Sequence, residues 1–241
     1  MDFINSLPQV DHVEIWLEQS LNFSELKFLK FLLSSYKTII HAPFIHLSLV
    51  SPHPEVIKTT IKSYLQIMQI AKILGAKLVT FHTGTQLKFT PEKIAIKLLA
   101  KNLNNFKNSY KGKIRFTIEN MPSDAVGGVQ SHYPKSLKNL AQLKKLLPWL
   151  KFTLDIGHAF QSGENQKEIS KFIKKYKKSI LDIHLHDAKL KGKAHMSLGE
   201  GDLDVDLLFQ LLEKIEYTGY VSLETITKEN TKKSWRKICK L

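Results

Sequence analysis

Residues able to bind a metal ion recur along the chain, and most of them close a short apolar run. The candidate ligands are His41, His82, Glu119, Asp155, His158, His184, His195 and Glu224. Imidazole and carboxylate ligands together suit zinc or manganese, and also cobalt or iron(II). Burying these groups in one place is costly unless metal or hydrogen bonds compensate. We therefore predict a divalent metal cofactor, zinc or manganese, with one or two ions per chain.

A second pattern lies two residues before several of these candidates, where a polar side chain recurs. Residues two apart on a strand share a face, so these side chains should point the same way as the ligands. They could then support the ligands by hydrogen bonding from one layer below. The residues concerned are Thr80, Thr117, Thr153, Asp182 and Ser222.

The elements that must position the candidates alternate between short β-rich runs and longer helical patterns. Repeated strand–helix units predict an α/β fold with a parallel sheet covered by helices. The C-terminal strand ends of a TIM-type (β/α) barrel converge on one mouth, where active sites lie. Such a barrel normally has eight strands, whereas we predict seven, with the usual first strand missing and residues 1–241 forming one domain. The predicted strands are 12–16, 37–43, 77–84, 114–122, 151–159, 180–188 and 220–226.

Helix boundaries are indicated by local signals. In the segment 54–75, Ile57, Ile61, Leu65, Met68 and Ile73 fall near one helical face, and Gly75 is a natural stop. Thr90 is predicted to cap the helix that follows, with proline at its first position.

Composition and charge restrict the class of protein. The chain of 241 residues is 43% hydrophobic, which is typical of a globular, soluble protein. No apolar run reaches the roughly 18 residues needed to span a bilayer, and the first residues lack the pattern of a signal peptide. The single cysteine, Cys239, fits a reducing cytoplasm. The formal net charge of +14 favours anionic partners such as nucleic acid or phosphorylated metabolites. No membrane partner is expected.

These motifs together resemble the xylose isomerase-like TIM-barrel superfamily, which includes sugar isomerases and epimerases and endonuclease IV. The stretches that carry the resemblance span nearly the whole chain. They are "HAPFIHLSLVSP", "LVTFHTG", "FTIEN", "TLDIGHAFQSG", "IHLHDAK", "HMSLGEGDLD" and "VSLETI".

The resemblance implies specific ligand sets. In the endonuclease IV pattern, a first metal would use His41, His82 and a bridging Glu119. A second metal would use Glu119 with the three ligands Asp155, His184 and Glu224. A third would use His158, His195 and an aspartate two residues before His195, where this chain has Lys193. The sugar-epimerase pattern requires only the second set, which is complete here.

The resemblance first suggests an isomerase or epimerase acting on a small sugar or sugar phosphate. Metal-assisted proton transfer would use Glu119 and Glu224 as acid and base. A substrate phosphate could then be bound by Lys189, Lys191 or Lys193, which could equally form an exposed basic loop.

The alternative is a metal-dependent endonuclease that cleaves DNA at abasic sites after flipping a nucleotide. The positive charge favours it. Against it stand the lysine at 193, the missing first strand and Phe44, which replaces the tyrosine that enters DNA in endonuclease IV. A degenerate barrel without activity is a third possibility, and a homo-oligomer could cover the open barrel edge.

The stretch 182–201 contains three histidines with different expected roles. His184 should be a ligand, because it ends a strand whose apolar neighbours face the other way. His186 is predicted to be a supporting residue at best. His195 and His158 should face each other without a third ligand, because a protonated Lys193 offers no lone pair and repels a dication. We expect at most two tightly bound metals. The remaining candidates are interpreted as structural: His12, His53 and His132.

Overall fold

The computed structural model describes residues 2–19, 21–123, 125–126 and 128–240. These residues form two compact units, and each is described by itself. The first unit runs to Glu119 and also includes Ala125–Tyr133 and Gln142–Leu150. The second begins at Asn120 and also includes Pro134–Ala141 and the chain from Lys151 onward.

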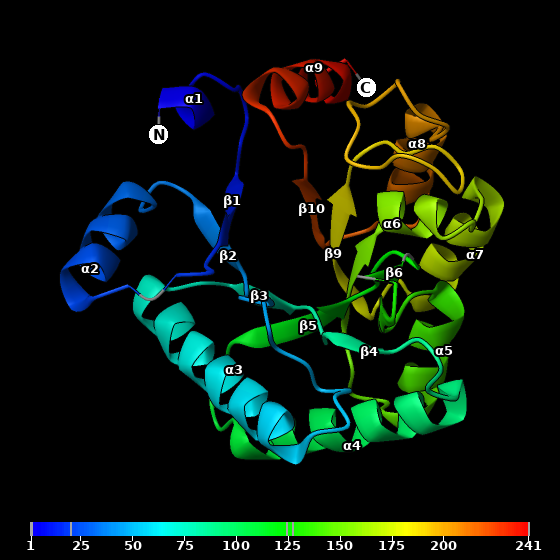
Figure 1. Ribbon diagram of the computed structural model, residues 1–241. Coiled ribbons are helices and arrows are strands. Elements are labelled where there is room, and N and C mark those ends of the chain that lie inside the picture. Colours follow the sequence, from blue (N-terminus) through cyan, green and yellow to red (C-terminus); the bar gives the residue numbers. More distant parts are fainter. Residues whose placement is uncertain (1, 20, 124, 127, 241) are drawn as a thin grey trace. The chain divides into compact units, whose positions relative to one another are not determined.

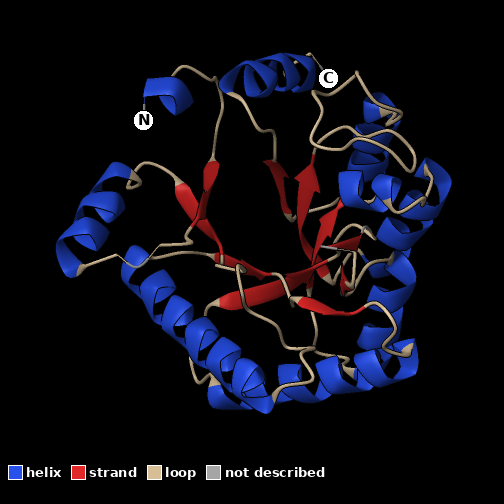
Figure 2. Cartoon of the chain, in the orientation of Figure 1, coloured by secondary structure: helices blue, strands red, loops and turns tan. Residues whose placement is uncertain are grey.

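The first unit contains four parallel strands in the order β1-β2-β3-β5. Its strands are β1 (His12–Trp16), β2 (Lys37–His41), β3 (Leu78–Phe81) and β5 (Arg115–Glu119). Its helices are α1 (Asp2–Asn5), α2 (Phe23–Leu32), α3 (Pro54–Leu74) and α4 (Glu92–Ser109). The long helices α3 and α4 lie side by side (Figures 1 and 2).

An aromatic cluster joins these two helices to the strands that carry candidate ligands. Tyr64 of α3 stacks on Phe81 of β3, with ring centroids 4.2 Å apart. Phe106 of α4 lies 5.4 Å from Phe81 and 5.0 Å from Phe116 of β5. Offset and edge-to-face aromatic pairs of this kind add stability beyond area burial. The cluster therefore packs the end of β3 and the start of β5 against α3 and α4.

A small antiparallel sheet, which was not predicted, also belongs to the first unit. It contains β4 (Thr85–Leu87), β7 (Gln130–His132) and β6 (Ala125–Val126) in that order. Thr85 pairs with His132 across the sheet, so His132 lies on a structural strand.

The second unit contains three parallel strands in the order β8-β9-β10. These are β8 (Phe152–Asp155), β9 (Ile180–Leu185) and β10 (Tyr220–Leu223). Its helices are α6 (Ile156–Gln161), α7 (Gln166–Tyr176), α8 (Val205–Lys214) and α9 (Lys228–Ile238). Helix α5 (Leu137–Leu146) begins among the residues of this unit.

The described residues contain seven parallel strands, which confirms the predicted number. Before β1 they contain only the short helix α1. Every strand begins within a residue of its predicted start, and most end earlier than predicted. Among these described residues, no helix is long and apolar enough to cross a membrane.

Three local predictions were wrong. His158 lies in α6 rather than on a strand, because Asp155 ends β8 and its side chain accepts the His158 N–H to cap the helix. The cap of α4 is Pro91 rather than Thr90, and the helix begins at Glu92. The predicted face of α3 was also wrong except for Met68, although Gly75 ends the helix with a φ of 73°, as expected.

The buried side of α3 is formed by a different set of residues, and Ile73 is 37% exposed. The buried residues are Thr60, Tyr64, Ile67, Met68, Ala71 and Leu74.

Candidate metal centre

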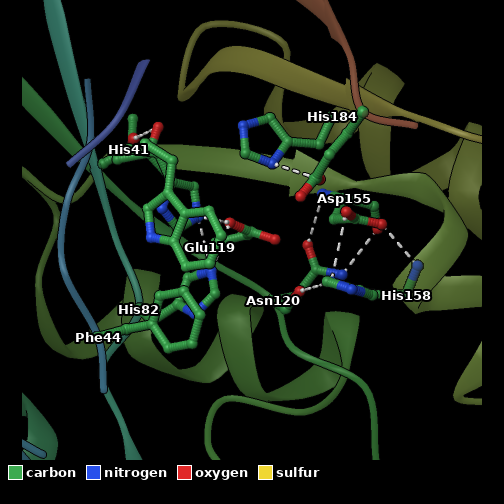
Figure 3. Close-up of polar contacts among 12 residues, drawn as sticks. His41, Phe44, His82, Glu119, Asn120, Asp155, His158 and His184 are labelled. Carbon is green, nitrogen blue, oxygen red and sulfur yellow. Dashed lines mark hydrogen bonds and ion pairs between the residues drawn. The ribbon is translucent and has the colours of Figure 1, made fainter. Parts of the chain in front are cut away.

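Three candidate ligands converge in the first unit. Nε2 of His41 lies 3.0 Å from Nε2 of His82. Oε2 of Glu119 lies 3.1 Å from the His82 nitrogen and 3.7 Å from the His41 nitrogen. His41 ends β2, His82 directly follows β3 and Glu119 ends β5, so three strand ends supply one cluster (Figure 3).

The cluster fits a divalent ion. All three side chains are buried, with Glu119 only 1% exposed. Two ligands bound to zinc at about 2.0–2.1 Å in tetrahedral geometry lie about 3.3 Å apart, close to the three observed separations. Two imidazole nitrogens and one carboxylate oxygen form a donor set that zinc accepts. The backbone at His82 is held in place, because the Tyr64 hydroxyl donates a hydrogen bond to the carbonyl oxygen of His82.

An aromatic pair lies beside this cluster. The ring of Phe44 is 4.5 Å from that of His82, and the Trp16 ring stacks on Phe44 at 5.7 Å with an interplanar angle of 10°. Glu18 holds both, because its carboxylate accepts the Trp16 indole N–H and the backbone N–H groups of Phe44 and Ile45. Phe44 therefore lies where it could contact a substrate bound at His82.

In the second unit, Asp155 is fixed from several sides. The Asn120 side chain accepts the Asp155 N–H at 2.9 Å and donates to the Asp155 carbonyl at 2.8 Å. Oδ1 of Asp155 accepts the backbone N–H of His158 at 2.5 Å. Nδ1 of His158 donates to the Asn120 carbonyl oxygen and lies 3.3 Å from Asp155 Oδ2. Asp155 is fully buried, so these contacts determine its orientation.

Asp155 shares its surroundings with two other candidates of the same unit. Nδ1 of His184 lies 3.2 Å from Oε2 of Glu224. Ligand atoms of Asp155, His184 and Glu224 lie within 4.8 Å of one another. Asp155 and His184 are register partners on adjacent strands, which explains why they meet.

The five polar residues that precede candidate ligands by two positions are all buried: Thr80, Thr117, Thr153, Asp182 and Ser222. In the second unit, the Ser222 hydroxyl donates to Asp182 at 2.9 Å. In the first unit, the Thr117 hydroxyl lies 3.4 Å from that of Thr80.

A third group of imidazoles lies in the second unit: His158, His186 and His195. His158 is 5.5 Å from His186 and 5.4 Å from His195, between ring centroids. Burial lowers the pKa of His186, but the Asp155 carboxylate outweighs this effect and raises the pKa above its ordinary value. Burial, together with the neighbouring His186, lowers the pKa of His195.

The three lysines predicted to meet a substrate phosphate lie in the loop after β9. Nζ of Lys189 forms an ion pair with Asp202 at 2.8 Å. Lys191 and Lys193 are exposed. Lys189 is thus partly neutralised, and Lys191 and Lys193 are the more accessible candidates.

The sequence analysis did not identify three residues that hold or make room for side chains of the candidate site: Asn120, Glu18 and Gly157. Asn120 follows Glu119 directly, and a polar residue after a strand-end ligand was a usable signal for it. Glu18 and Gly157 act through residues distant in the sequence, as their contacts with Phe44 and His186 show. No local pattern indicated them.

Residues 10–241 match the family model described as "Xylose isomerase-like TIM barrel". The chain is a member of this family. The match runs through both units.

Among curated relatives of this TIM-barrel family member, the uncharacterized protein MJ1614 of Methanocaldococcus jannaschii is 30% identical over 220 residues. That alignment covers 90% of this chain and 82% of the relative. A probable endonuclease 4 of Thermosipho melanesiensis is 25% identical over 211 residues, covering 83% of this chain and 70% of the relative.

Solved structures show the same fold at low identity. A D-tagatose 3-epimerase-like protein superposes with a TM-score of 0.79 at 22% identity, covering 95% of this chain and 87% of the other. The IOLI protein, solved with a zinc atom, superposes with a TM-score of 0.75 at 16% identity, covering 95% and 84%. The family thus includes relatives named for two different reactions.

Proposed function

We propose that this family member is a metal-dependent phosphodiesterase that cleaves DNA at abasic sites, the endonuclease IV type of activity. The observation that carries the proposal is the convergence of His41, His82 and Glu119 within 3.7 Å. A single-metal epimerase needs neither histidine, whereas a multi-metal phosphodiesterase needs a cluster of this kind.

The residues present would hold more than one ion. His41, His82 and Glu119 would hold one, and Asp155, His184 and Glu224 another. Within the second unit, the Asn120 amide is bound to Asp155 and holds that ligand in place. When bound, divalent ions would supply an activated water and offset the negative charge that develops on the phosphate.

Charge and aromatic groups support a DNA substrate. The net charge of +14 favours association with a phosphate backbone. Trp16 is 59% exposed and stacks on Phe44 beside the cluster, and it offers a ring face on which an unstacked base can lie. A surface hollow in the second unit is rich in cations, among them the exposed Arg236.

A second candidate function is isomerisation or epimerisation of a small sugar or sugar phosphate. The pairing of His184 with Glu224, with Asp155 nearby, favours it, because these are the ligands that the single-metal pattern requires. In this case Glu119 and Glu224 would move the proton, and Lys191 or Lys193 could bind a phosphate.

One pair of substitutions separates the two functions. The variant carrying His41→Ala and His82→Ala should lose cleavage of an abasic-site duplex and should leave an epimerase active. The purified protein, loaded with zinc or manganese, is assayed on that duplex, on an undamaged duplex and on a panel of ketohexoses and sugar phosphates. His53→Ala, an exposed residue, is the control. Turnover of a ketose that survives the double substitution would overturn the nuclease proposal.

A further inference from the structure

His186 is a fully buried histidine that neither candidate reaction has used so far. It lies one residue beyond the end of β9, and its Nε2 is 3.1 Å from Oδ2 of Asp155. Asp155 is equally buried and belongs to the proposed metal ligands. The contact therefore links His186 directly to a proposed metal ligand.

The backbone of His195 determines which nitrogen of His186 carries a proton. Nδ1 of His186 has two backbone neighbours: the His195 N–H at 2.9 Å and the Asp187 carbonyl oxygen at 3.3 Å. The shorter contact requires Nδ1 to accept, and we assign no hydrogen to this nitrogen. A neutral imidazole has one donor and one acceptor nitrogen. The proton therefore lies on Nε2, from which it is donated to Asp155 Oδ2.

The loop that supplies this N–H is held in one conformation by hydrogen bonds to the backbone and side chain of Asp187. His195 has a left-handed φ of 53°, which costs free energy for a residue other than glycine. Reciprocal backbone hydrogen bonds between Asp187 and Met196 hold the loop in that conformation. Asp187 in turn accepts the N–H groups of Ala188, Gly199 and Leu203.

Gly157 leaves room for the His186 ring. A Cβ atom at position 157 would overlap Cε1 and Nδ1 of His186. Gly157 is not among the glycines with positive φ, so its backbone conformation is open to other residues. The space that it leaves is the physical reason for glycine at this position.

Ligand atoms of His158, His186 and His195 lie within 4.8 Å of one another, but both nitrogens of His186 already have hydrogen-bond partners. Two imidazoles bound to one zinc in tetrahedral geometry have centroids about 5 Å apart. His158 meets this spacing with each of the others, but His186 and His195 are 4.1 Å apart and stacked at 25°. Their in-plane lone pairs therefore run side by side instead of converging.

We infer that His186 is a positioning residue for Asp155: its Nε2–H fixes the carboxylate for metal binding, and Gly157 admits its ring. The inference rests on the proposed role of Asp155 as a ligand, which both candidate reactions share. Residues that hydrogen-bond a metal ligand orient it and tune its affinity.

The first test is a double-mutant cycle read by metal affinity. Zinc affinity of the full chain is measured by competition with a chromophoric chelator. His186→Ala and Gly157→Ala should each weaken binding about 10- to 100-fold. The double variant should be no weaker than His186→Ala, because the ring that collides with the new methyl group is gone. Unchanged affinity in His186→Ala, or fully additive losses, would overturn the inference.

Two replacements separate hydrogen bonding from packing. His186→Phe keeps a ring but lacks the donor, so it should weaken binding as His186→Ala does. His186→Gln retains an N–H donor and should recover part of the affinity. Retention of full affinity in His186→Phe would show that packing alone matters and would contradict the inference.

The tautomer is tested without any metal or substrate. Nitrogen-15 NMR of histidine-labelled protein at pH 8, with the His186 signal assigned by its loss in His186→Phe, should show a protonated Nε2 and a bare Nδ1. The opposite tautomer would overturn the inference. If Asp155→Ala retains the zinc affinity and stoichiometry of the unmodified chain, the proposed metal site fails, while the hydrogen bond itself stands.

Discussion

Glu119 is the residue on which both candidate reactions depend. It is 1% exposed and lies against two imidazoles, so it can act as a ligand and can exchange a proton with a bound substrate. Glu119→Gln should lower turnover by at least about 100-fold on whichever substrate proves correct, because the amide is a poor ligand and no base. Activity is measured with the metal-loaded variant, and circular dichroism verifies the fold. An active variant would remove Glu119 from the mechanism.

Lys193 should limit the number of bound metals. The exposed lysine two residues before His195 offers no ligand atom while protonated. We expect at most two ions per chain after gentle dialysis, measured by elemental analysis. Lys193→Asp should recruit a third, with a gain of one equivalent.

The unmodified chain is the reference for this count, and anomalous scattering locates the ions. If the unmodified chain holds three ions at full occupancy, one of them bound by His158 and His195, the predicted limit of two ions is refuted.

The sequence predicted the types of candidate ligand and their places at strand ends, since metal chemistry restricts both. It did not reveal what fixes them. Asn120 clamps Asp155 from a position 35 residues away, and Gly157 matters only because His186 fills the space beside it. Such roles depend on packing between distant residues, which periodicity does not encode.

At the scale of elements, Glu164 ties the start of α5 to the end of α6. Its carboxylate accepts the backbone N–H of Leu137, the first residue of α5, at 2.7 Å. Burial raises the pKa of Glu164 from 4.5 to about 7, and the nearby Glu168 adds to the effect. The fold therefore favours the protonated form. The resulting stability is full below pH 4.5 and is lost as pH rises through about 7.

Glu164→Gln should remove this pH dependence, because the amide keeps the acceptor oxygen and has no charge to bury. Between pH 5 and pH 8.5, the unmodified chain should lose about 2 kcal/mol more unfolding free energy than the variant. Urea unfolding at both pH values measures the difference. Glu168→Gln, on the exposed side of the same region, should change it far less. Parallel losses in Glu164→Gln and the unmodified chain would contradict the assignment.

Strands were easier to predict than helix faces. Short β-branched runs are bounded by polar residues, so all the starts were nearly correct. The face of α3 was misjudged because Ile57, Ile61 and Leu65 are only partly buried, while Thr60 and Tyr64 point inward. Thr60 bonds the Ser48 backbone N–H and Tyr64 bonds His82, so polar contacts determine which face is buried.

At the scale of the whole molecule, the net charge of +14 should make DNA binding steeply dependent on salt. The hollow that includes α9 is lined by Leu198, Glu229, Lys232, Lys233, Arg236, Lys237 and Lys240. If this surface contacts the phosphate backbone, Arg236→Ala should reduce the slope of log affinity against log salt by about one. Fluorescence anisotropy with a labelled abasic duplex measures the slope.

The chain has one other arginine, Arg115, and it provides a matched control. Arg115 is exposed and begins β5, at the opposite end of that strand from Glu119. Arg115→Ala should leave the slope unchanged. Equal effects of the two substitutions would mean that the positive charge acts only as a diffuse field.

The chain-wide order of strands and helices was predictable, because each strand–helix unit repeats the same pattern. The small sheet β4-β7-β6 was not, since its strands have two or three residues and their partners are remote in the sequence. Strands this short carry too few residues for an alternating pattern to be detected.

The contacts of Trp16 with Glu18 and Phe44 make its fluorescence a natural probe of the candidate site. The indole is 59% exposed, hydrogen-bonded to Glu18 and stacked on Phe44, which in turn lies against His82. With Trp149 and Trp235 replaced by phenylalanine, emission would come from this one ring. An ion that binds at His82, or a base or sugar that stacks on the ring, would then change the fluorescence intensity of Trp16. Binding could thus be followed in real time without a label and before a substrate is known.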